Sequence, residues 1–306
     1  MFRKLNTKIL LILLVGLLAI VGGVYLLDQR NGERTFKESL VKTNSDKIDK
    51  IILFPKQGKE MELNKNGSNW TVSHNGVSYP ADNAAIKDLI NSLNPLKTES
   101  VVSSNPMRYK DFDLEDSTAV RVKLMQGSEL IADLLIGKLE MSSNQNMSTF
   151  VRLVNDKIAY SVAGYLSWNV NREMDSYRSH IVIEGNKADW SKLEFIYPAD
   201  SSFILEKQDE GKWHIGLVDL NLADVEKYLD QLQNLNGTKF SAQMPPSNPI
   251  FTLKISGNKL AAQVEIKGYL GSSQNIVVSS NLNNGNLFDV KDLTDKLFPG
   301  KRRFMK

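Results

Sequence analysis

Two stretches with the same spacing of apolar residues decide the fold: AIKDLINSLNPL at residues 85–96 and DVEKYLDQLQNL at residues 224–235. In each stretch the apolar side chains fall at i, i+3, i+4, i+7 and i+10, on one face of an α-helix. The two stripes are Ile86, Leu89, Ile90, Leu93, Leu96 and Val225, Tyr228, Leu229, Leu232, Leu235. Asp82 and Asn221 precede them at the position of an N-cap. The spacing predicts helices over 84–96 and 223–235, the second ending at Asn236-Gly237.

Strand patterns surround each helix in the same order. Segments 48–54 and 190–196 open the two copies, and a hairpin with a Gly-bearing turn follows each. After the helices, apolar residues alternate with polar ones, as in strands with one buried face: Val120, Val122, Leu124; Phe251, Leu253, Ile255. A short helix is expected at Ala163–Val170 and at Lys291–Leu297. Each copy reads β-β-β-α-β-β-β-β-α, so we expect an α+β fold of two tandem related modules with mainly antiparallel sheets.

An apolar segment precedes both modules. Residues Ile9–Leu27 read ILLILLVGLLAIVGGVYLL without a charge. As a helix this segment is about 28 Å long, close to a hydrocarbon core of about 30 Å. Arg3, Lys4 and Lys8 precede it, so the positive-inside rule places the N-terminus in the cytoplasm and residues 28–306 outside. The alternative is a signal peptide cleaved near Gly23. The apolar run continues beyond that point, which favours a single uncleaved membrane anchor.

The expected organisation follows from these patterns. It comprises a cytoplasmic N-terminus at 1–8, a transmembrane helix at 9–27, a linker at 28–45, a first module at 46–180, a second module at 188–300 and a basic tail at 301–306.

Composition and charge exclude several classes of function. The chain has no cysteine, which excludes a disulfide scaffold, a thiolate zinc site and a cysteine nucleophile. The whole chain carries +3, the first 30 residues +3 and the last six +4, so the residues between them carry −4. A nucleic-acid binder needs a basic face on its folded part, and this distribution argues against one. No glycine-rich phosphate loop is present outside the apolar segment.

The stretch RYKDFDLEDS at residues 108–117 is the candidate metal site. Its carboxylates, at Asp111, Asp113, Glu115 and Asp116, are hard oxygen ligands of the kind that Ca²⁺ prefers. The stretch lacks the glycine and the distant glutamate of an EF-hand loop. The alternative interpretation, which we favour, is an acidic turn before a strand with its apolar residues packed inward.

The remaining candidates are His74, His180 and His214 as acid–base groups, and Trp70 and Trp213 as rings that could stack on a ligand. No catalytic spacing surrounds any of the histidines. We expect the His214 side chain on the solvent face of its strand. The two tryptophans occupy matching places in the two copies, which favours a position in each core. We therefore expect no catalytic residue and no cofactor.

A further set of residues resembles a known family. The order Tyr109, Phe112-Asp-Leu114, an alternating strand, Leu134-Leu-Ile-Gly-Lys138, Thr149-Phe-Val-Arg152 and Ile158-Ala-Tyr-Ser-Val162 resembles the bacterial family called domain of unknown function 4340. The resemblance covers most of residues 45–300. It implies a single-span extracytoplasmic protein, encoded beside ABC-type exporter subunits that include gliding-motility transporters. It carries no catalytic residues.

The expectation is therefore a non-enzymatic accessory protein of an ABC-type export system. Its partners would be the membrane, through Ile9–Leu27, and the transporter subunits, with no nucleic acid. The alternatives are a module that binds a cell-envelope polymer and, third, a wall-polymer hydrolase whose paired carboxylates come from distant positions.

Overall fold

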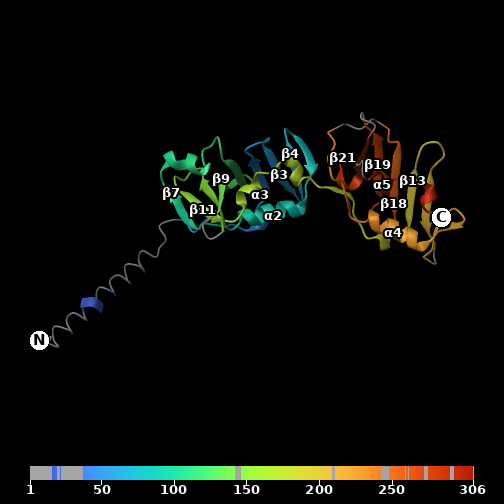
Figure 1. Ribbon diagram of the computed structural model, residues 1–306, viewed down its shortest axis with the longest axis horizontal. Helices are drawn as coiled ribbons and strands as arrows, with labels where there is room; N and C mark the ends of the chain where they lie inside the picture. The colour runs from blue at the N-terminus through green and yellow to red at the C-terminus, as the bar shows by residue number, and fades with distance from the viewer. Residues whose placement is uncertain are drawn as a thin grey trace.

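The computed structural model describes residues 16–18, 21, 37–141, 146–208, 211–242, 248–258, 260, 262–271, 275–289 and 293–305. Two antiparallel sheets lie one after the other along the longest axis of the molecule (Figure 1). A few helices pack on them, so the α+β class predicted from the sequence is confirmed.

The first sheet has nine strands in the order β5-β4-β3-β2-β8-β9-β10-β11-β7, and every neighbouring pair is antiparallel. The central pairing of β2 with β8 sets Ile51 opposite Leu124 and Leu53 opposite Val122, so one face carries a row of buried aliphatic residues. The strands are β2 (Lys50–Phe54), β3 (Met61–Asn66), β4 (Asn69–His74), β5 (Val77–Pro80), β7 (Ser100–Ser103), β8 (Val120–Gln126), β9 (Glu129–Met141), β10 (Met147–Leu153) and β11 (Ala159–Ala163).

The second sheet has eight strands in the order β16-β15-β14-β13-β18-β19-β20-β21, again all antiparallel. Its central pair repeats the arrangement, with Leu193 opposite Ile255 and Phe195 opposite Leu253. The strands are β13 (Lys192–Ile196), β14 (Phe203–Lys207), β15 (Trp213–Ile215), β16 (Val218–Asp219), β18 (Phe251–Ser256), β19 (Val264–Leu270), β20 (Ile276–Ser280) and β21 (Leu287–Asp289).

Each sheet begins with four strands before its helix, where the sequence pattern predicted three. The additional strands, β5 and β16, are short edge strands that follow a tight turn. Asn75 and Gly76 form the turn before β5, and both have left-handed backbone angles (φ 49° and 78°), as a two-residue hairpin turn requires. Strands this short carry no readable alternation, which is why the pattern missed them.

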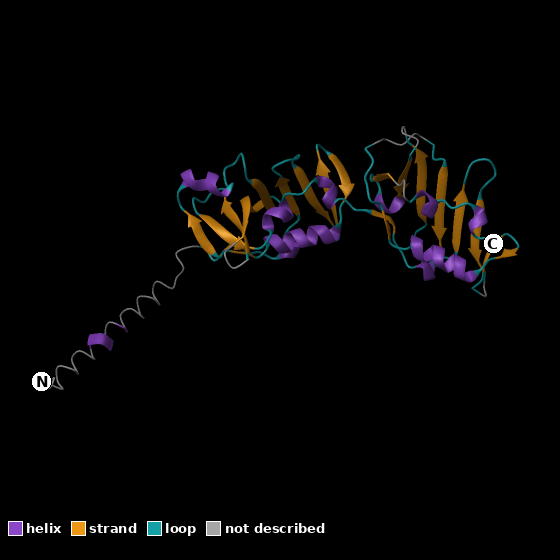
Figure 2. Cartoon of the chain, viewed as in Figure 1, coloured by secondary structure: helices purple, strands orange, loops and turns teal. Residues whose placement is uncertain are grey.

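The two predicted helices are confirmed as α2 (Asn83–Leu93) and α4 (Leu222–Leu232), and each runs along one side of its sheet (Figure 2). The Asp82 carboxylate accepts hydrogen bonds from the N–H groups of residues 84 and 85 at 2.8 and 3.2 Å. The Asn221 side chain accepts one from residue 223 at 2.9 Å. The first four apolar residues of each stripe are buried.

Both helices end three residues before the predicted boundary. Leu96 and Leu235, the last residues of the stripes, lie in short strands β6 (Leu96–Lys97) and β17 (Leu235–Asn236). The first helix stops because Pro95 disfavours a helical conformation in the residue before it. After the second helix, Asn234 takes a left-handed conformation (φ 57°) and turns the chain.

Gly237 is therefore not the helix end that the sequence suggested. It lies beyond β17, where a Cβ atom would overlap the Phe288 ring, so the glycine permits a close approach of backbone to ring.

The short closing helices also begin later than predicted. They are α3 (Leu166–Val170) and α5 (Thr294–Leu297). Two further small sheets, β1 (Ser39–Val41) with β6 and β12 (Ile181–Ile183) with β17, extend the structure beyond the predicted strands. The β1 residues Leu40 and Val41 are buried in the first core, so the end of the segment expected to be a linker packs with the first sheet.

The described residues bury two large apolar cores, one per sheet, and a smaller third cluster on the first sheet. Trp70 belongs to the first core and Trp213 to the second, with 7% and 1% of their surfaces exposed. Their prediction as core residues is confirmed.

The predicted membrane segment Ile9–Leu27 lies outside the described residues, except for residues 16–18 and 21. Among the residues that the structure describes, no helix has both the length and the apolar character needed to cross a membrane.

Candidate functional site

The acidic stretch at 108–117 packs on one face of the first sheet. It starts with the 3₁₀ helix η2 (Pro106–Phe112), whose N-cap Asn105 accepts a hydrogen bond from the N–H of residue 107 at 3.0 Å. Asp113 ends the helix in a left-handed conformation (φ 56°). Leu114 is fully buried, so the stretch is held on the sheet by its apolar residue while its carboxylates face outward.

Three of the four carboxylates proposed as metal ligands are engaged by cations of the protein. Asp111 pairs with the Arg108 Nε at 3.2 Å, Asp113 with the Lys56 Nζ at 2.9 Å, and Asp116 with the Arg152 Nη2 at 3.1 Å. The fourth residue, Glu115, is exposed.

The three paired carboxylates therefore interact with separate cations and do not converge. Within the described ranges, no three His, Cys, Asp or Glu side chains gather in an arrangement that could hold a metal ion.

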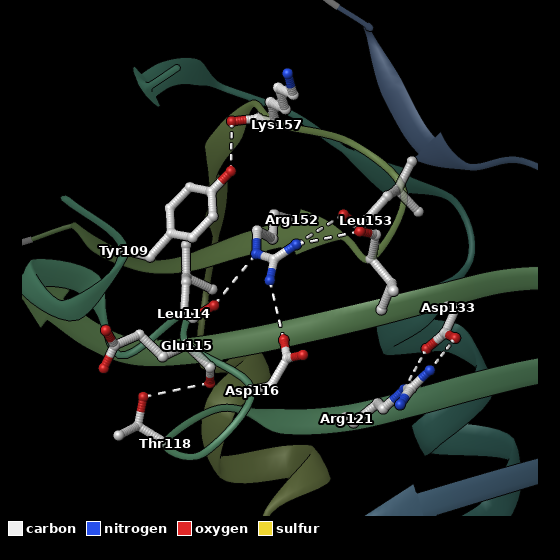
Figure 3. Close-up of polar contacts among 11 residues, drawn as sticks. Tyr109, Leu114, Glu115, Asp116, Thr118, Arg121, Asp133, Arg152, Leu153 and Lys157 are labelled. Carbon is white, nitrogen blue, oxygen red and sulfur yellow. Dashed lines mark hydrogen bonds and ion pairs between the residues drawn. The ribbon is translucent and has the colours of Figure 1, made fainter. Parts of the chain in front are cut away.

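Arg152 on β10 is the centre of the polar network beneath η2 (Figure 3). Its side chain is 8% exposed, and its guanidinium donates to the carbonyl oxygens of Leu114, Leu153 and Val154 at 3.2–3.4 Å. The guanidinium lies 4.6 Å from the Tyr109 ring centroid. A buried cation needs such compensation, because desolvation of an isolated charge is costly. Arg152 thus fastens the acidic stretch to the sheet.

The residues that carry the family resemblance meet at this place. Tyr109, Leu114, Phe150 and Ala159 form the third apolar cluster, and Phe112 packs on it. The glycine of the LLIGK stretch has a role here as well.

A Cβ at Gly137 would overlap the carbonyl oxygen of Phe112, so only a glycine lets η2 approach β9 this closely. Together with Arg152, these residues build a packing and hydrogen-bonding unit between η2 and the sheet.

The three histidines lie apart, His74 on β4, His214 on β15 and His180 in the connection before β12, and each has a partner. His74 on β4 contacts the Glu60 carbonyl oxygen at 2.6 Å, and His180 contacts the Gly237 carbonyl oxygen at 2.8 Å. His214 is 9% exposed and lies 2.9 Å from an Asp219 carboxylate oxygen. The expectation that His214 faces solvent was therefore wrong. The short β15–β16 hairpin brings Asp219 directly opposite His214, so its carboxylate lies beside the ring.

A hollow of about 300 Å³ opens beside His74. Glu60, Glu62, Ser73 and the Asn75-Gly76 turn also line it, so its polar side chains are mostly hydrogen-bond acceptors. Lys50 donates a hydrogen bond to Glu62 at 2.9 Å, and this bond holds the pKa of the Glu62 carboxyl below its usual value. The hollow can accept a positively charged or donor-rich group, but one of its two carboxylates is already paired.

An exposed aromatic pair lies at α3, beside the first sheet. Tyr165 and Trp168 are 50% and 63% exposed, and their rings stack with centroids 5.3 Å apart. Exposed aromatic rings of this kind are typical of contact surfaces, because they offer a large apolar area at a small cost in side-chain entropy. Trp168 has no counterpart in the second copy of the sequence pattern, so the pattern predicts no role for it.

Neither Glu60 with Glu62 nor Tyr165 with Trp168 was recognised from the sequence as a group. For Glu62 a signal existed, since the two-residue turn Gly67-Ser68 between β3 and β4 fixes the hairpin register that places Glu62 opposite Ser73. For the aromatic pair the signal was a spacing of three residues in a short helix, too common a pattern to carry a prediction.

Comparison with known proteins gives one match. The family model described as domain of unknown function (DUF4340) matches residues 70–249, which is more than half of the chain. No curated protein and no solved structure matched it. The matched range contains η2, Arg152 and the residues packed around them. The chain therefore belongs to the family of the domain of unknown function DUF4340.

Proposed function

We propose that this protein is a membrane-anchored, extracytoplasmic accessory protein that acts by contact with an ABC-type export system. The apolar segment Ile9–Leu27 and its basic N-terminal flank support the anchor and the orientation. The transporter partner rests on the family resemblance.

One structural observation favours contact over catalysis. The residues that characterise the family, centred on Arg152 and Tyr109, are consumed by packing and by hydrogen bonds to backbone carbonyls. An enzyme family would be expected to share a cleft with polar groups poised for substrate.

We further propose that the two sheets are related modules from one duplication. The strand orders β5-β4-β3-β2-β8-β9-β10-β11 and β16-β15-β14-β13-β18-β19-β20-β21 correspond position by position. The helix that follows the fourth strand has an N-capping Asp or Asn in both, and a Trp begins the third strand's buried face in both.

The second candidate is binding to a cell-envelope polymer, and the Tyr165–Trp168 pair favours it. A ring that is 63% exposed can stack on the apolar face of a sugar. Either function would use this pair as a contact surface, so variants of the pair can distinguish the two functions.

The test is purification of the full-length protein from detergent-solubilised membranes. We expect transporter subunits to co-purify with the wild-type chain. The double variant Tyr165→Ala/Trp168→Ala should lower their recovery at least fivefold, while Leu217→Ala, a fully exposed residue of the second module, should not.

Complementation of a deletion strain by residues 28–306 exported without the anchor gives an independent measure. Tethering raises the effective concentration at a membrane partner to roughly the millimolar range, so the free form should complement poorly. Co-sedimentation with isolated envelope polymer that Trp168→Ala abolishes, without any transporter subunit, would instead establish the second candidate.

A further inference from the structure

The connection from the first sheet to the second is short, and its backbone is hydrogen-bonded to both halves. Tyr177 is buried in the first core and Val182 in the second, so four residues connect the two cores. The N–H of Ser179 donates to the Pro80 carbonyl at 2.8 Å, and the N–H of Gly237 donates to the His180 carbonyl at 2.8 Å. Connections between domains are commonly exposed and crossed by few contacts. This one is held from both sides.

Arg178 lies at the centre of this connection. Its side chain is almost completely buried, and its guanidinium lies between two rings: Tyr79 at 4.0 Å and Phe240 at 3.8 Å from their centroids. Its Nε donates to Asn286 at 2.8 Å and its Nη1 to Asp175 at 2.9 Å. Tyr79 belongs to the edge strand β5 of the first sheet, whereas Phe240 and Asn286 belong to the second half of the chain. The cation therefore touches both sides.

Two buried asparagines complete the contact. Asn283 and Asn286 have no exposed surface, and Asn286 donates to the Asn283 side chain at 2.6 Å. Asn286 also reaches the carbonyl oxygens of Pro80 and Ser179, at 3.4 and 3.3 Å. Asn283 donates to the Ser179 and Ile181 carbonyls at 2.7 and 2.9 Å. A buried amide that loses a hydrogen-bond partner costs free energy, so the network favours the arrangement of the two halves in which all these bonds form.

From this geometry we propose that Arg178 is a clamp that holds the two sheets as one rigid body. Separation of the halves would withdraw one ring from a desolvated guanidinium and would take the Pro80 carbonyl, one of its acceptors, away from the buried Asn286 amide. A cation between two aromatic faces is strongest when water is excluded, as it is here. The edge of the first sheet at β5 and the turn before β21 meet at this place, between the two halves (Figure 1).

Rigidity has a consequence for any partner. A protein or polymer that contacts the first module is held at a fixed distance and angle from the second module. The rigidity of the connection does not depend on the partner's identity, so it can be tested separately from the proposed function.

The experiment measures the distance between the two halves. The chain has no cysteine, so Glu129→Cys and Lys227→Cys, both at exposed positions in the first and second halves, introduce two unique sites for spin labels in the full-length protein in detergent. Pulsed electron paramagnetic resonance should give one narrow distance distribution. In the Arg178→Ala variant we expect the distribution to widen at least twofold.

Arg152→Ala is the matched control. Arg152 is also a buried arginine stacked on a tyrosine and paired with an aspartate, but its contacts all lie within the first module. It should leave the distribution narrow. Arg178→Lys, which keeps the charge but loses the planar group, should give an intermediate width.

Should Arg178→Ala fail to fold, Phe240→Leu decides the question, since it removes one ring and keeps an apolar side chain. A distribution as narrow as that of the wild-type protein in the decisive variant would overturn the proposal. Equal widening by Arg152→Ala would overturn it too, because the effect would then be general destabilisation.

Discussion

The two sheets share a strand order but differ in what covers their ends. The first sheet continues beyond β11 to a ninth strand, β7. It also carries η2 on the face opposite its helices, and the third apolar cluster lies between η2 and the sheet. The second sheet ends at β21, and among its described residues no element corresponds to η2. Its core is instead rich in aromatic contacts, such as the stacked Phe195 and Phe203 rings.

The opposite edges differ as well. The edge strand β5 of the first sheet is covered only in its second half, where Tyr79 packs on Arg178 and the turn at Gly285 lies close by, while Val77 at its start is 53% exposed. The corresponding strand of the second sheet, β16, carries Val218 at 46% exposure next to the fully exposed Leu217. Equivalent strands thus acquire different roles from their neighbours: a central connection in one half and a free edge in the other.

The largest expected effect tests whether the two cores are equivalent. Leu93→Ala and Leu232→Ala remove fully buried side chains at the same place in α2 and α4. Each should lower the free energy of unfolding by about 2–5 kcal/mol, the range for large-to-small changes in packed cores. Urea denaturation followed by circular dichroism measures it. A cost under about 1 kcal/mol for one of them alone would mean that the two helices do not play equivalent roles.

A smaller effect should distinguish the two partners of the network under η2. Arg152→Ala removes the hydrogen bonds that the guanidinium donates to three backbone carbonyls and should cost about 1–3 kcal/mol. Asp116→Asn removes a carboxylate whose side chain is 81% exposed, and should cost less than about 1 kcal/mol. Thermal unfolding of both variants checks the order. A reversed order would show that the ion pair, and not the carbonyl contacts, holds the acidic stretch.

The smallest effect compares a tyrosine hydroxyl from each core. The Tyr177 hydroxyl donates to the Asn169 carbonyl at 2.9 Å, whereas the Tyr228 hydroxyl is buried and has no hydrogen-bond partner among the residues that the structure describes. Tyr177→Phe should therefore cost about 1 kcal/mol, and Tyr228→Phe should be neutral or stabilising. Chemical denaturation at pH 7 measures both. Equal losses of unfolding free energy in the two variants would contradict the difference in hydrogen bonding between the two hydroxyls.

The same tyrosines make the stability of the fold depend on pH in the alkaline range. Burial raises the pKa of Tyr177 to about 12 and raises the pKa of Tyr228 well above its usual value. Between pH 10 and these folded-state values the unfolded chain loses phenolic protons that the folded chain keeps. Stability should therefore fall as the pH rises above 10, and less steeply in Tyr228→Phe.

Much of this fold could be read from the chain. The apolar stripes of α2 and α4, their N-caps and the alternating strands β8 and β18 are local patterns, and each was found where it was expected. The ends of the helices were not, because a proline and a left-handed asparagine overrode the continuing stripe. The acidic stretch was located correctly, but its pairing with Lys56 and Arg152 depends on strands distant in sequence.

What the sequence by itself determined is the class and the order of elements, because periodicity and capping act within a few residues along the chain. It also supplied the residues of the family resemblance. Only the tertiary structure decided what those residues do. Arg152, Gly137 and Tyr109 are far apart in sequence, and their common role under η2 exists only once β9 and β10 are paired. The role of Arg178 was likewise beyond any local pattern, since its two aromatic neighbours come from opposite halves of the chain, 99 residues before it in one case and 62 after it in the other.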